Sequence, residues 1–359
     1  MRRAASPFPA RAGEAGQPAR PQFGALVVSL DFELHWGVRD LPGANGWYRR
    51  NLLGVRRAVP RILELFAEFG VSATWATVGF LFARSRGEQE RFWPALRPAY
   101  RDPGLSPYGE RVGEGEHDDP LHFAPSLIEA IRACPRQEIG THTFSHYYCL
   151  EAGQTRETFG ADLDSAAAIA AERGMRLRSI VFPRNQHNPG YDGVLLERGI
   201  VCYRGNPQGS LHRALGAARE SRRVRAARLV DAFVDMAGPC TTPWDRVLEP
   251  SGLCNVPASR FLRPCVPGAG PLDALRLRRI GDAMRHAARA GEIFHLWWHP
   301  HNFGAYVDQN VALLRRVLEI FDGLRRTCGM RSMSMEEVAM QVTPAAGRGL
   351  EALSRRGTA

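Results

Sequence analysis

Short apolar runs rich in β-branched and aromatic residues alternate along this chain with longer segments of helical periodicity. This order predicts parallel strands joined by crossover helices, because two parallel strands need a long connection between them. The expected strands are Ala25–Leu30, Ala73–Thr77, Glu138–Thr141, Ser179–Phe182, Ile200–Tyr203 and Ile293–Trp298. The expected helices lie near residues 55–69, 125–133, 157–173, 191–198, 272–290 and 308–326. The alternation therefore indicates an α/β fold, built as a parallel sheet or a barrel.

The alternating part is expected to form a single domain over residues 23–342, because α/β barrels of about 250 residues or more fold as one unit. Residues 1–22 and 343–359 are rich in arginine and small residues, which predicts flexible tails. Two stretches, near 84–122 and 204–270, are rich in proline, glycine and arginine. They are expected to be long excursions from the scaffold that contact substrate or form a lid.

The composition is typical of a soluble globular protein, since 44% of the 359 residues are hydrophobic and 23% are charged. A net charge of +10 suggests nucleic acid as a partner, but all 47 basic residues are arginines scattered in short groups. We interpret this charge as compositional bias and expect no nucleic-acid partner.

Seven irregularly spaced cysteines exclude a disulfide scaffold, and the sequence has no Cys-x-x-Cys pair. No apolar run reaches the roughly 18 residues of a membrane span. The first 22 residues also lack the apolar stretch of a signal peptide. The sequence therefore predicts a cytoplasmic protein with no membrane span.

Two carboxylates lie at the end of the first expected strand, in Leu30-Asp31-Phe32-Glu33. Spaced two residues apart, Asp31 and Glu33 share one side of an extended segment, at the strand end where parallel α/β folds place their sites. With a metal between them, one carboxylate can bind the ion and the other can act as a base. The alternative is a helix cap or a carboxylate paired with arginine.

Two histidines follow the third expected strand, in Glu138-Ile139-Gly140-Thr141-His142-Thr143-Phe144-Ser145-His146. If the chain enters a helical turn here, His142 and His146 point the same way and can share a divalent metal. The alternative is a pair of polar loop histidines. A further group, His117-Asp118-Asp119 with His122, could form a second metal site, although its glycine- and glutamate-rich loop favours solvated side chains.

The last expected strand ends in Leu296-Trp297-Trp298-His299-Pro300. Period-two alternation places His295, Trp297, His299 and His301 on one side of this segment. A histidine at a strand end can protonate a leaving amine at neutral pH. The alternative for His299 is a packed, hydrogen-bonded residue.

Together, the acidic segment, the His-x-x-x-His segment and the Leu-Trp-Trp-His-Pro segment resemble the polysaccharide deacetylase family, the NodB-homology carbohydrate esterases. The three segments occur in the family's order, and the resemblance spans residues 23–302. It implies an irregular (β/α)-barrel of about seven strands. It also implies a divalent metal, commonly zinc, held by Glu33, His142 and His146, with Asp31 as the base that activates water. His299 would protonate the departing amine.

Three family motifs are altered. The first commonly has adjacent aspartates, whereas here Phe32 separates Asp31 from Glu33, and an exchange of roles between these two residues stays open. The third, in which an arginine precedes a proline, is represented by Val181-Phe182-Pro183-Arg184-Asn185, and we assign Arg184 to orient the base. The motif that fixes the catalytic histidine is absent, and Asp231 or Asp235 could replace its aspartate. Substrate contacts are expected from aromatic and polar residues beside the motifs, with packing in the core as the alternative for the aromatic ones. These residues are His35, Trp36, Tyr147, Asn185 and Trp298.

The resemblance implies a metal-dependent hydrolase that removes acetyl groups, N-acetyl before O-acetyl, from a sugar or polysaccharide precursor. In the cytoplasm, the substrate would be an acetylated amino sugar linked to a nucleotide or a lipid. Three alternatives remain: a hydrolase of a small non-sugar amide on the same scaffold, a glycosidase that uses the paired carboxylates, and a catalytically inactive carbohydrate-binding or assembly protein.

Overall fold

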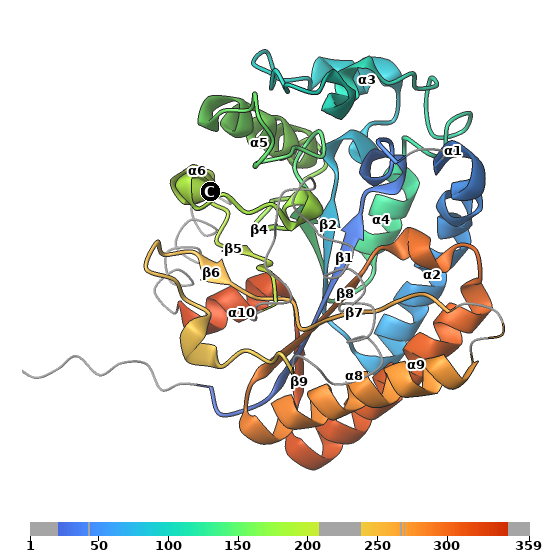
Figure 1. Ribbon diagram of the computed structural model, residues 1–359, viewed down its shortest axis with the longest axis vertical. Coiled ribbons are helices and arrows are strands. Elements are labelled where there is room, and N and C mark those ends of the chain that lie inside the picture. Colours follow the sequence, from blue (N-terminus) through green and yellow to red (C-terminus); the bar gives the residue numbers. More distant parts are fainter. Residues whose placement is uncertain (1–20, 42–43, 208–237, 266–267, 269, 344–359) are drawn as a thin grey trace, which may run out of the picture.

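The computed structural model describes residues 21–41, 44–207, 238–265, 268 and 270–343, and its centre is a parallel sheet (Figure 1). The sheet order is β6-β5-β4-β3-β2-β1-β8-β7, and β9 pairs with β1. Its strands are β1 (Ala25–Phe32), β2 (Ala73–Thr77), β3 (Gln137–Thr141), β4 (Ser179–Ile180), β5 (Cys202–Tyr203), β6 (Cys254–Asn255), β7 (Arg260–Phe261), β8 (Ile293–Trp298) and β9 (Arg331–Met333). The α/β class predicted from the alternation is confirmed.

One extended segment, residues 254–262, connects the two ends of this sheet. Its first half pairs with β5, since the backbone N–H of Val256 donates to the Tyr203 carbonyl at 2.9 Å. Its second half pairs with β8, since the N–H groups of Ser259 and Leu262 each donate to β8 carbonyls at 2.8 Å. The described residues form nine strands. If β6 and β7 are counted as one strand and β9, which pairs only with β1, is left out, seven strands form the barrel. The expected (β/α)-barrel is confirmed.

Helices surround the sheet, and in Figure 1 α2, α8 and α9 pack along one side of it. The helices are α1 (Ala44–Trp47), α2 (Arg49–Phe69), α3 (Arg86–Arg91), α4 (Pro125–Ala133), α5 (Arg156–Ala171), α6 (Asp192–Glu197), α8 (Gly270–Ala290), α9 (Val307–Cys328) and α10 (Met335–Val342). The six expected helices are present, whereas α1, α3 and α10 were not predicted. Among the described residues, no helix is long and apolar enough to cross a membrane.

Strand β1 shows how the barrel divides its side chains. All eight of its residues are buried, but they belong to two different environments. Leu26, Val28, Leu30 and Phe32 pack in the core beneath the helices, whereas Ala25 and Val27 belong to a second core cluster. Because side chains alternate along a strand, Asp31 continues the row of Ala25 and Val27. This places the Asp31 carboxylate inside the carboxyl end of the barrel.

The expected excursion at 84–122 contains α3 and two short 3₁₀ helices, Pro103–Leu105 and Pro107–Gly109. Much of the second, at 204–270, lies outside the described residues, as do Asp231 and Asp235. The expected tails, 1–22 and 343–359, also lie almost entirely outside them. The division of the chain into one domain with two tails therefore stays a prediction.

Candidate active site

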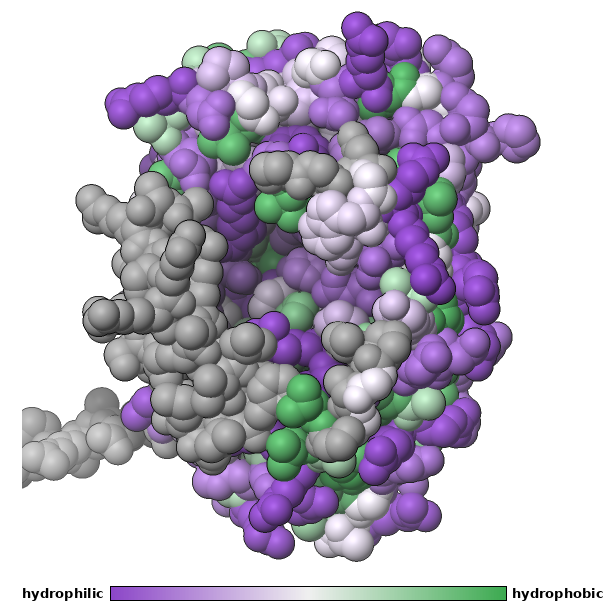
Figure 2. Space-filling view, turned by 45° about the vertical axis from the view of Figure 1, so that its right-hand side comes forward, coloured by the Kyte–Doolittle hydropathy of each residue, from purple (hydrophilic) through white to green (hydrophobic). Residues whose placement is uncertain are grey.

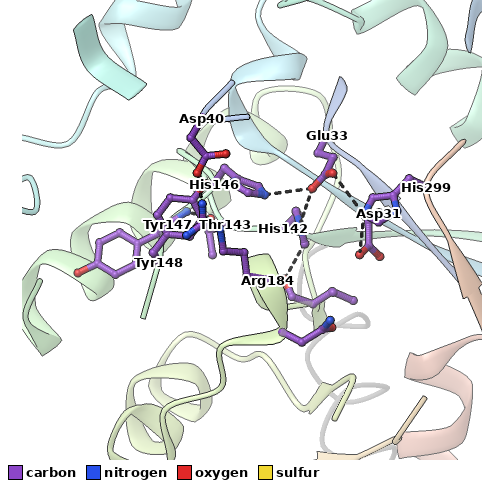
Figure 3. A network of polar contacts seen from close by, with 12 residues as sticks. Asp31, Glu33, Asp40, His142, Thr143, His146, Tyr147, Tyr148, Arg184 and His299 are labelled. Carbon is purple, nitrogen blue, oxygen red and sulfur yellow. Dashed lines mark hydrogen bonds and ion pairs between the residues drawn. The ribbon is translucent and has the colours of Figure 1, made fainter. Parts of the chain in front are cut away.

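Side chains from three strand ends meet at the carboxyl end of the barrel (Figure 3). Asp31 and Glu33 come from the end of β1, His142 follows β3, and His299 follows β8. Strands β1, β2 and β3 pair in parallel, and β8 pairs in parallel on the other side of β1. Their carboxyl ends therefore lie at one edge, which brings together residues far apart in the sequence.

Glu33, His142 and His146 form a compact set of potential metal ligands. Oε2 of Glu33 lies 3.1 Å from Nε2 of His142 and 3.0 Å from Nε2 of His146, and all three residues are buried. Figure 3 shows the three side chains pointing toward one another. Two histidine nitrogens and one carboxylate oxygen are a common ligand set of catalytic zinc.

The hydrogen bonding of His142 tests whether this set fits a cation. Its Nδ1 lies 2.8 Å from the backbone carbonyl of Val181, which can only accept, so Nδ1 carries the proton. In a neutral ring, Nε2 then presents a lone pair to a carboxylate oxygen of Glu33. Burial lowers the pKa of His146 to about 4, so that its ring is neutral near pH 7. A cation between these facing lone pairs removes their repulsion, and the residues fit a divalent metal.

The His-x-x-x-His segment does not form the helical turn that would align the two histidines. Thr143 and His146 instead adopt left-handed conformations, with φ of 64° and 57°, which cost energy in a residue with a side chain. The buried carboxylate of Asp162, on α5, accepts hydrogen bonds from the backbone N–H groups of Phe144 at 2.7 Å and Ser145 at 3.2 Å. Asp162 therefore holds the strained turn that aims both histidines at Glu33.

Sequence reasoning missed Asp162, although a signal was present. Asp162 lies on the buried face of α5 with Phe159, Leu163 and Ala166, at the three- and four-residue spacing of an apolar stripe. A carboxylate in such a stripe needs buried donors. Nothing in the sequence indicates which donors those are.

Asp31 is paired with a buried arginine, Arg204, which follows β5. The two side chains make a bidentate contact, with N–O distances of 2.6 and 2.7 Å, and Arg204 is 1% exposed. The guanidinium also donates to Ser29 Oγ at 3.0 Å and to Asn185 Oδ1 at 3.1 Å. Burial alone would raise the pKa of Asp31, but Arg204 and His299 hold it below its usual value. Asp31 is therefore a carboxylate at neutral pH.

The assignment of Arg184 as the residue that orients Asp31 was wrong, because Arg204 occupies that position. Arg184 pairs instead with Asp40, lies 3.6 Å from a carboxylate oxygen of Glu151, and stacks 4.2 Å above the Tyr148 ring. Its side chain is partly exposed. The motif position misled the prediction, whereas the position of Arg204 directly after a strand could have identified it.

His299 lies on the open side of the carboxylates. Its Nε2 is 3.3 Å from Oε1 of Glu33 and 3.7 Å from Oδ2 of Asp31, and its side chain is 24% exposed. On the other side of the ring, Nδ2 of Asn302 lies 3.5 Å from Nδ1 of His299, and the Tyr48 hydroxyl donates to Oδ1 of Asn302. This arrangement leaves Nε2 as the nitrogen that presents a proton to the site.

The backbone around His299 is held against α2 by two glycines. A Cβ on Gly54 would lie 2.1 Å from the Gly304 carbonyl oxygen, and one on Gly304 would lie 2.0 Å from the Asn51 carbonyl oxygen. The short helix that starts after His299, Pro300–Phe303, therefore touches α2 backbone to backbone. This contact sets the height of His299 above the barrel.

Four of the five predicted substrate-binding residues are buried and do not face a substrate. Trp298 packs in the core against Phe66 and Phe303, and the hydroxyl of Tyr147 bonds within the fold to Thr158. Trp36 and His35 are each 1% exposed. The assignments of Trp36, Tyr147 and Trp298 were wrong because the core takes aromatic residues from both sides of each motif. The assignment of His35 was wrong because its ring faces Glu110 and His122.

Asn185, the fifth, lines a cavity of about 340 Å³ beside His299. The half-buried indole of Trp297 forms part of its wall, 4.1 Å from the guanidinium carbon of Arg204. Four further arginines line the same cavity: Arg260, Arg263, Arg276 and Arg279. Figure 2 shows one face of the molecule hollowed, with mainly hydrophilic side chains around the opening.

The sequence matches no family model and no curated protein. The structure is similar to one from Mycobacterium smegmatis described as a polysaccharide deacetylase, with a TM-score of 0.56 and 16% identity over 93% of this chain and 96% of the other. A polysaccharide deacetylase structure from Pseudomonas aeruginosa PAO1 gives a TM-score of 0.50 and 12% identity over 91% and 95% of the two chains.

The chain has the polysaccharide deacetylase fold. Both similarities cover nearly the whole of each chain, so the resemblance found in the sequence is confirmed at the level of architecture. At these identities a shared fold does not fix an activity, because one fold supports several. In a chain with the polysaccharide deacetylase fold, the activity depends on the side chains at the carboxyl end of the barrel.

Proposed function

We propose that this chain is a metal-dependent hydrolase that removes acetyl groups from an amino sugar, N-acetyl in preference to O-acetyl. One observation carries the proposal. Nε2 of His142 and Nε2 of His146 lie 3.1 and 3.0 Å from the same carboxylate oxygen, Oε2 of Glu33. An ionised carboxylate, Asp31, and a partly exposed imidazole, His299, flank this set.

Glu33, His142 and His146 would hold the metal, which we expect to be zinc. Such an ion would supply a Lewis acid that polarises the acyl carbonyl and lowers the pKa of a water molecule. Asp31 accepts a proton from the water that attacks the acyl carbon, and Arg204 keeps its carboxylate oriented. A carboxylate held ionised at neutral pH suits a base.

His299 donates a proton from Nε2 to the departing nitrogen. An amine is a poor leaving group until it is protonated, so an amide substrate needs this acid more than an ester does. The 24% exposure of the His299 side chain allows a substrate to approach the ring from the cavity. This role supports N-acetyl as the preferred substrate.

The cavity beside His299 supports a substrate that carries a negative charge. Its volume, about 340 Å³, lies within the usual range of ligand pockets. Arg260, Arg263, Arg276 and Arg279 line it, and Asp273 pairs with Arg276. The Trp297 face beside them suits the C–H surface of a sugar ring. A nucleotide- or lipid-linked amino sugar in the cytoplasm is the substrate class we propose.

The glycosidase alternative needs one of the two carboxyl groups to keep its proton and act as an acid. Here the pKa values of Asp31 and Glu33 are both held below their usual values, so neither suits that acid. Two ionised carboxylates favour metal binding over glycoside hydrolysis.

The test combines metal content with acetate release from a nucleotide-linked N-acetylamino sugar and from an uncharged N-acetylamino-sugar oligomer. We expect Asp31→Asn to keep the metal and lose about 10²–10⁴-fold in kcat, and His142→Ala/His146→Ala to lose both. Asp164→Asn, on the exposed part of α5, serves as the matched control. Full activity in Asp31→Asn, or in the metal-free double variant, would overturn the proposal.

A further inference from the structure

A second group of metal-binding side chains lies outside the active site, between the turn after β1 and the excursion that precedes α4. One ring nitrogen each from His35 and His122 and one carboxylate oxygen from Glu110 all lie within 4.8 Å of one another. Nε2 of His35 is 3.4 Å from Oε1 of Glu110. The edge of a tetrahedral zinc site with ligand bonds near 2.0 Å is about 3.3 Å.

The environment of His122 is that of a metal ligand. Its Nδ1 lies 2.7 Å from Oδ2 of Asp119, and the backbone N–H groups of Gly113 and Leu121 donate to the same carboxylate at 2.8 and 3.3 Å. The Asp119 carboxylate acts as an acceptor for these N–H groups, and in the same way it accepts the Nδ1 proton of His122. Metal-binding histidines commonly donate their other nitrogen to a carboxylate in this way.

The proton on Nδ1 leaves Nε2 of His122 with a lone pair and no partner. That atom is buried without a hydrogen bond, in a residue that is 7% exposed. A buried polar atom without a partner is costly. A bound cation satisfies it.

The two segments that carry these ligands are fixed before any ion binds. The indole N–H of Trp36 donates to the His122 carbonyl at 3.1 Å, and the backbone N–H of His35 donates to the Leu121 carbonyl at 3.3 Å. The rings of His35 and His122 pack edge to face with centroids 4.5 Å apart. The Glu110 side chain is 32% exposed, which gives an ion access from solvent.

We propose that His35, Glu110 and His122 bind a second divalent metal ion of the zinc type, with Asp119 as the hydrogen-bond partner of His122. The ligands are distinct from Glu33, His142 and His146. The ion joins the 84–122 excursion to the end of β1 and stabilises that junction. His117 and Asp118, which the sequence grouped with His122, are exposed and take no part.

The proposal is tested on the full-length, tag-free protein, stripped of metal and dialysed against Zn²⁺, with bound metal counted per chain. We expect two ions in the wild type, one in His122→Ala and one in His142→Ala/His146→Ala. His117→Ala, an exposed histidine of the same loop, is the matched control and keeps two. The proposal is overturned if His122→Ala still binds two ions. It is also overturned if the wild type binds one ion and His142→Ala/His146→Ala binds none.

A milder variant covers the case in which His122→Ala does not fold. Asp119→Asn removes the carboxylate behind His122 and should weaken the second ion's affinity by about 10–100-fold, measured by competition with a chelator. An unchanged affinity for both ions counts against the site. A single ion that survives in His142→Ala/His146→Ala but not in His122→Ala would support this site and reject the proposed active-site metal, so the two proposals fail separately.

Discussion

Two pairs of acidic residues lie at opposite ends of the same barrel, and their surroundings differ. Asp31 and Glu33 are buried, whereas Glu138 is half-buried and the Glu336 side chain is 30% exposed. At the carboxyl end, Asp31 faces Arg204 and Glu33 faces two histidines. At the amino end, Glu138 of β3 accepts from the Thr74 hydroxyl at 2.6 Å and from the backbone N–H of Glu336 at 3.2 Å.

The pKa values of the two pairs shift in opposite directions. Burial raises the pKa of both Glu138 and Glu336, that of Glu336 to about 7 with the help of the Glu138 charge. At the other end, burial is outweighed by neighbouring groups, chiefly by Arg204 for Asp31 and by His299 for Glu33, so both pKa values are lowered. Burial alone thus raises the pKa of a carboxyl group, and neighbouring cationic groups are needed to keep it ionised.

The largest expected effect comes from removing the cation at the carboxyl end. Arg204→Gln leaves the buried Asp31 charge unpaired, which should cost about 3–5 kcal/mol of stability. In variants that fold, the pKa of Asp31 rises, so the acid limb of the pH profile of kcat/KM moves to higher pH. Arg204→Lys keeps the charge but loses the bidentate contact, and should shift the limb less.

Arg184→Gln is the matched control for this experiment, because Arg184 belongs to the third motif but pairs with Asp40. We expect no shift of the acid limb in Arg184→Gln. A shift equal to that of Arg204→Gln would mean that Arg184, rather than Arg204, controls Asp31.

A smaller effect is expected at Asp162, whose carboxyl group accepts from N–H and O–H donors and whose pKa burial raises to about 7. Asp162→Asn replaces an acceptor with an amide and loosens the turn of Thr143 and His146. The affinity of the active-site metal should fall by about 10–100-fold, measured by chelator competition. Asp164→Asn, two residues along α5, is the control and should leave the affinity unchanged. An unchanged affinity in Asp162→Asn would show that the turn keeps its conformation without the Asp162 carboxylate.

The smallest effect is expected at the amino end and concerns pH. Unfolded Glu336 releases its proton near pH 4.5, whereas the folded protein keeps it to about pH 7. Stability should therefore fall as the pH rises between these values, by roughly 1–2 kcal/mol after allowance for solvent screening. Urea unfolding across this range should show the slope in the wild type and a flatter one in Glu336→Gln.

The exposed Glu197→Gln serves as the control for that slope. The carboxyl end should behave in the opposite sense, because lowered pKa values add stability above the unfolded pKa. The contribution of Asp31 should disappear as the pH falls below about 3.8. An unchanged slope in Glu336→Gln would place the amino-end proton on another group.

Elements with a strong period could be predicted from the sequence. The bounds expected for β2, β8 and α4 are those of the structure, because long apolar runs and helical stripes reflect burial directly. Strands β6 and β7 have two residues each, too few to show a period. The segment that closes the barrel was therefore missed.

The errors in the site have a similar cause. The alternation that placed His299 inside the barrel also places Trp298 on the opposite face, under the helices, so the two assignments were incompatible from the start. Arg204 reaches Asp31 from 173 residues away in the sequence. The pairing of Arg204 with Asp31 depends on the order of the strands around the barrel. The periodicity of a single segment carries no information about that order.

The contact between Gly54 and Gly304 has a consequence for how this protein can change. Neither glycine has a side chain to offer a substrate, yet a single methyl group at either position would meet backbone atoms about 2 Å away and force α2 and the turn after His299 apart. His299 would then move while Glu33, His142 and His146 stayed in place. Substitutions at Gly54 and Gly304 are therefore constrained by the close approach of two backbones, although neither residue contacts the carboxylates or histidines of the site.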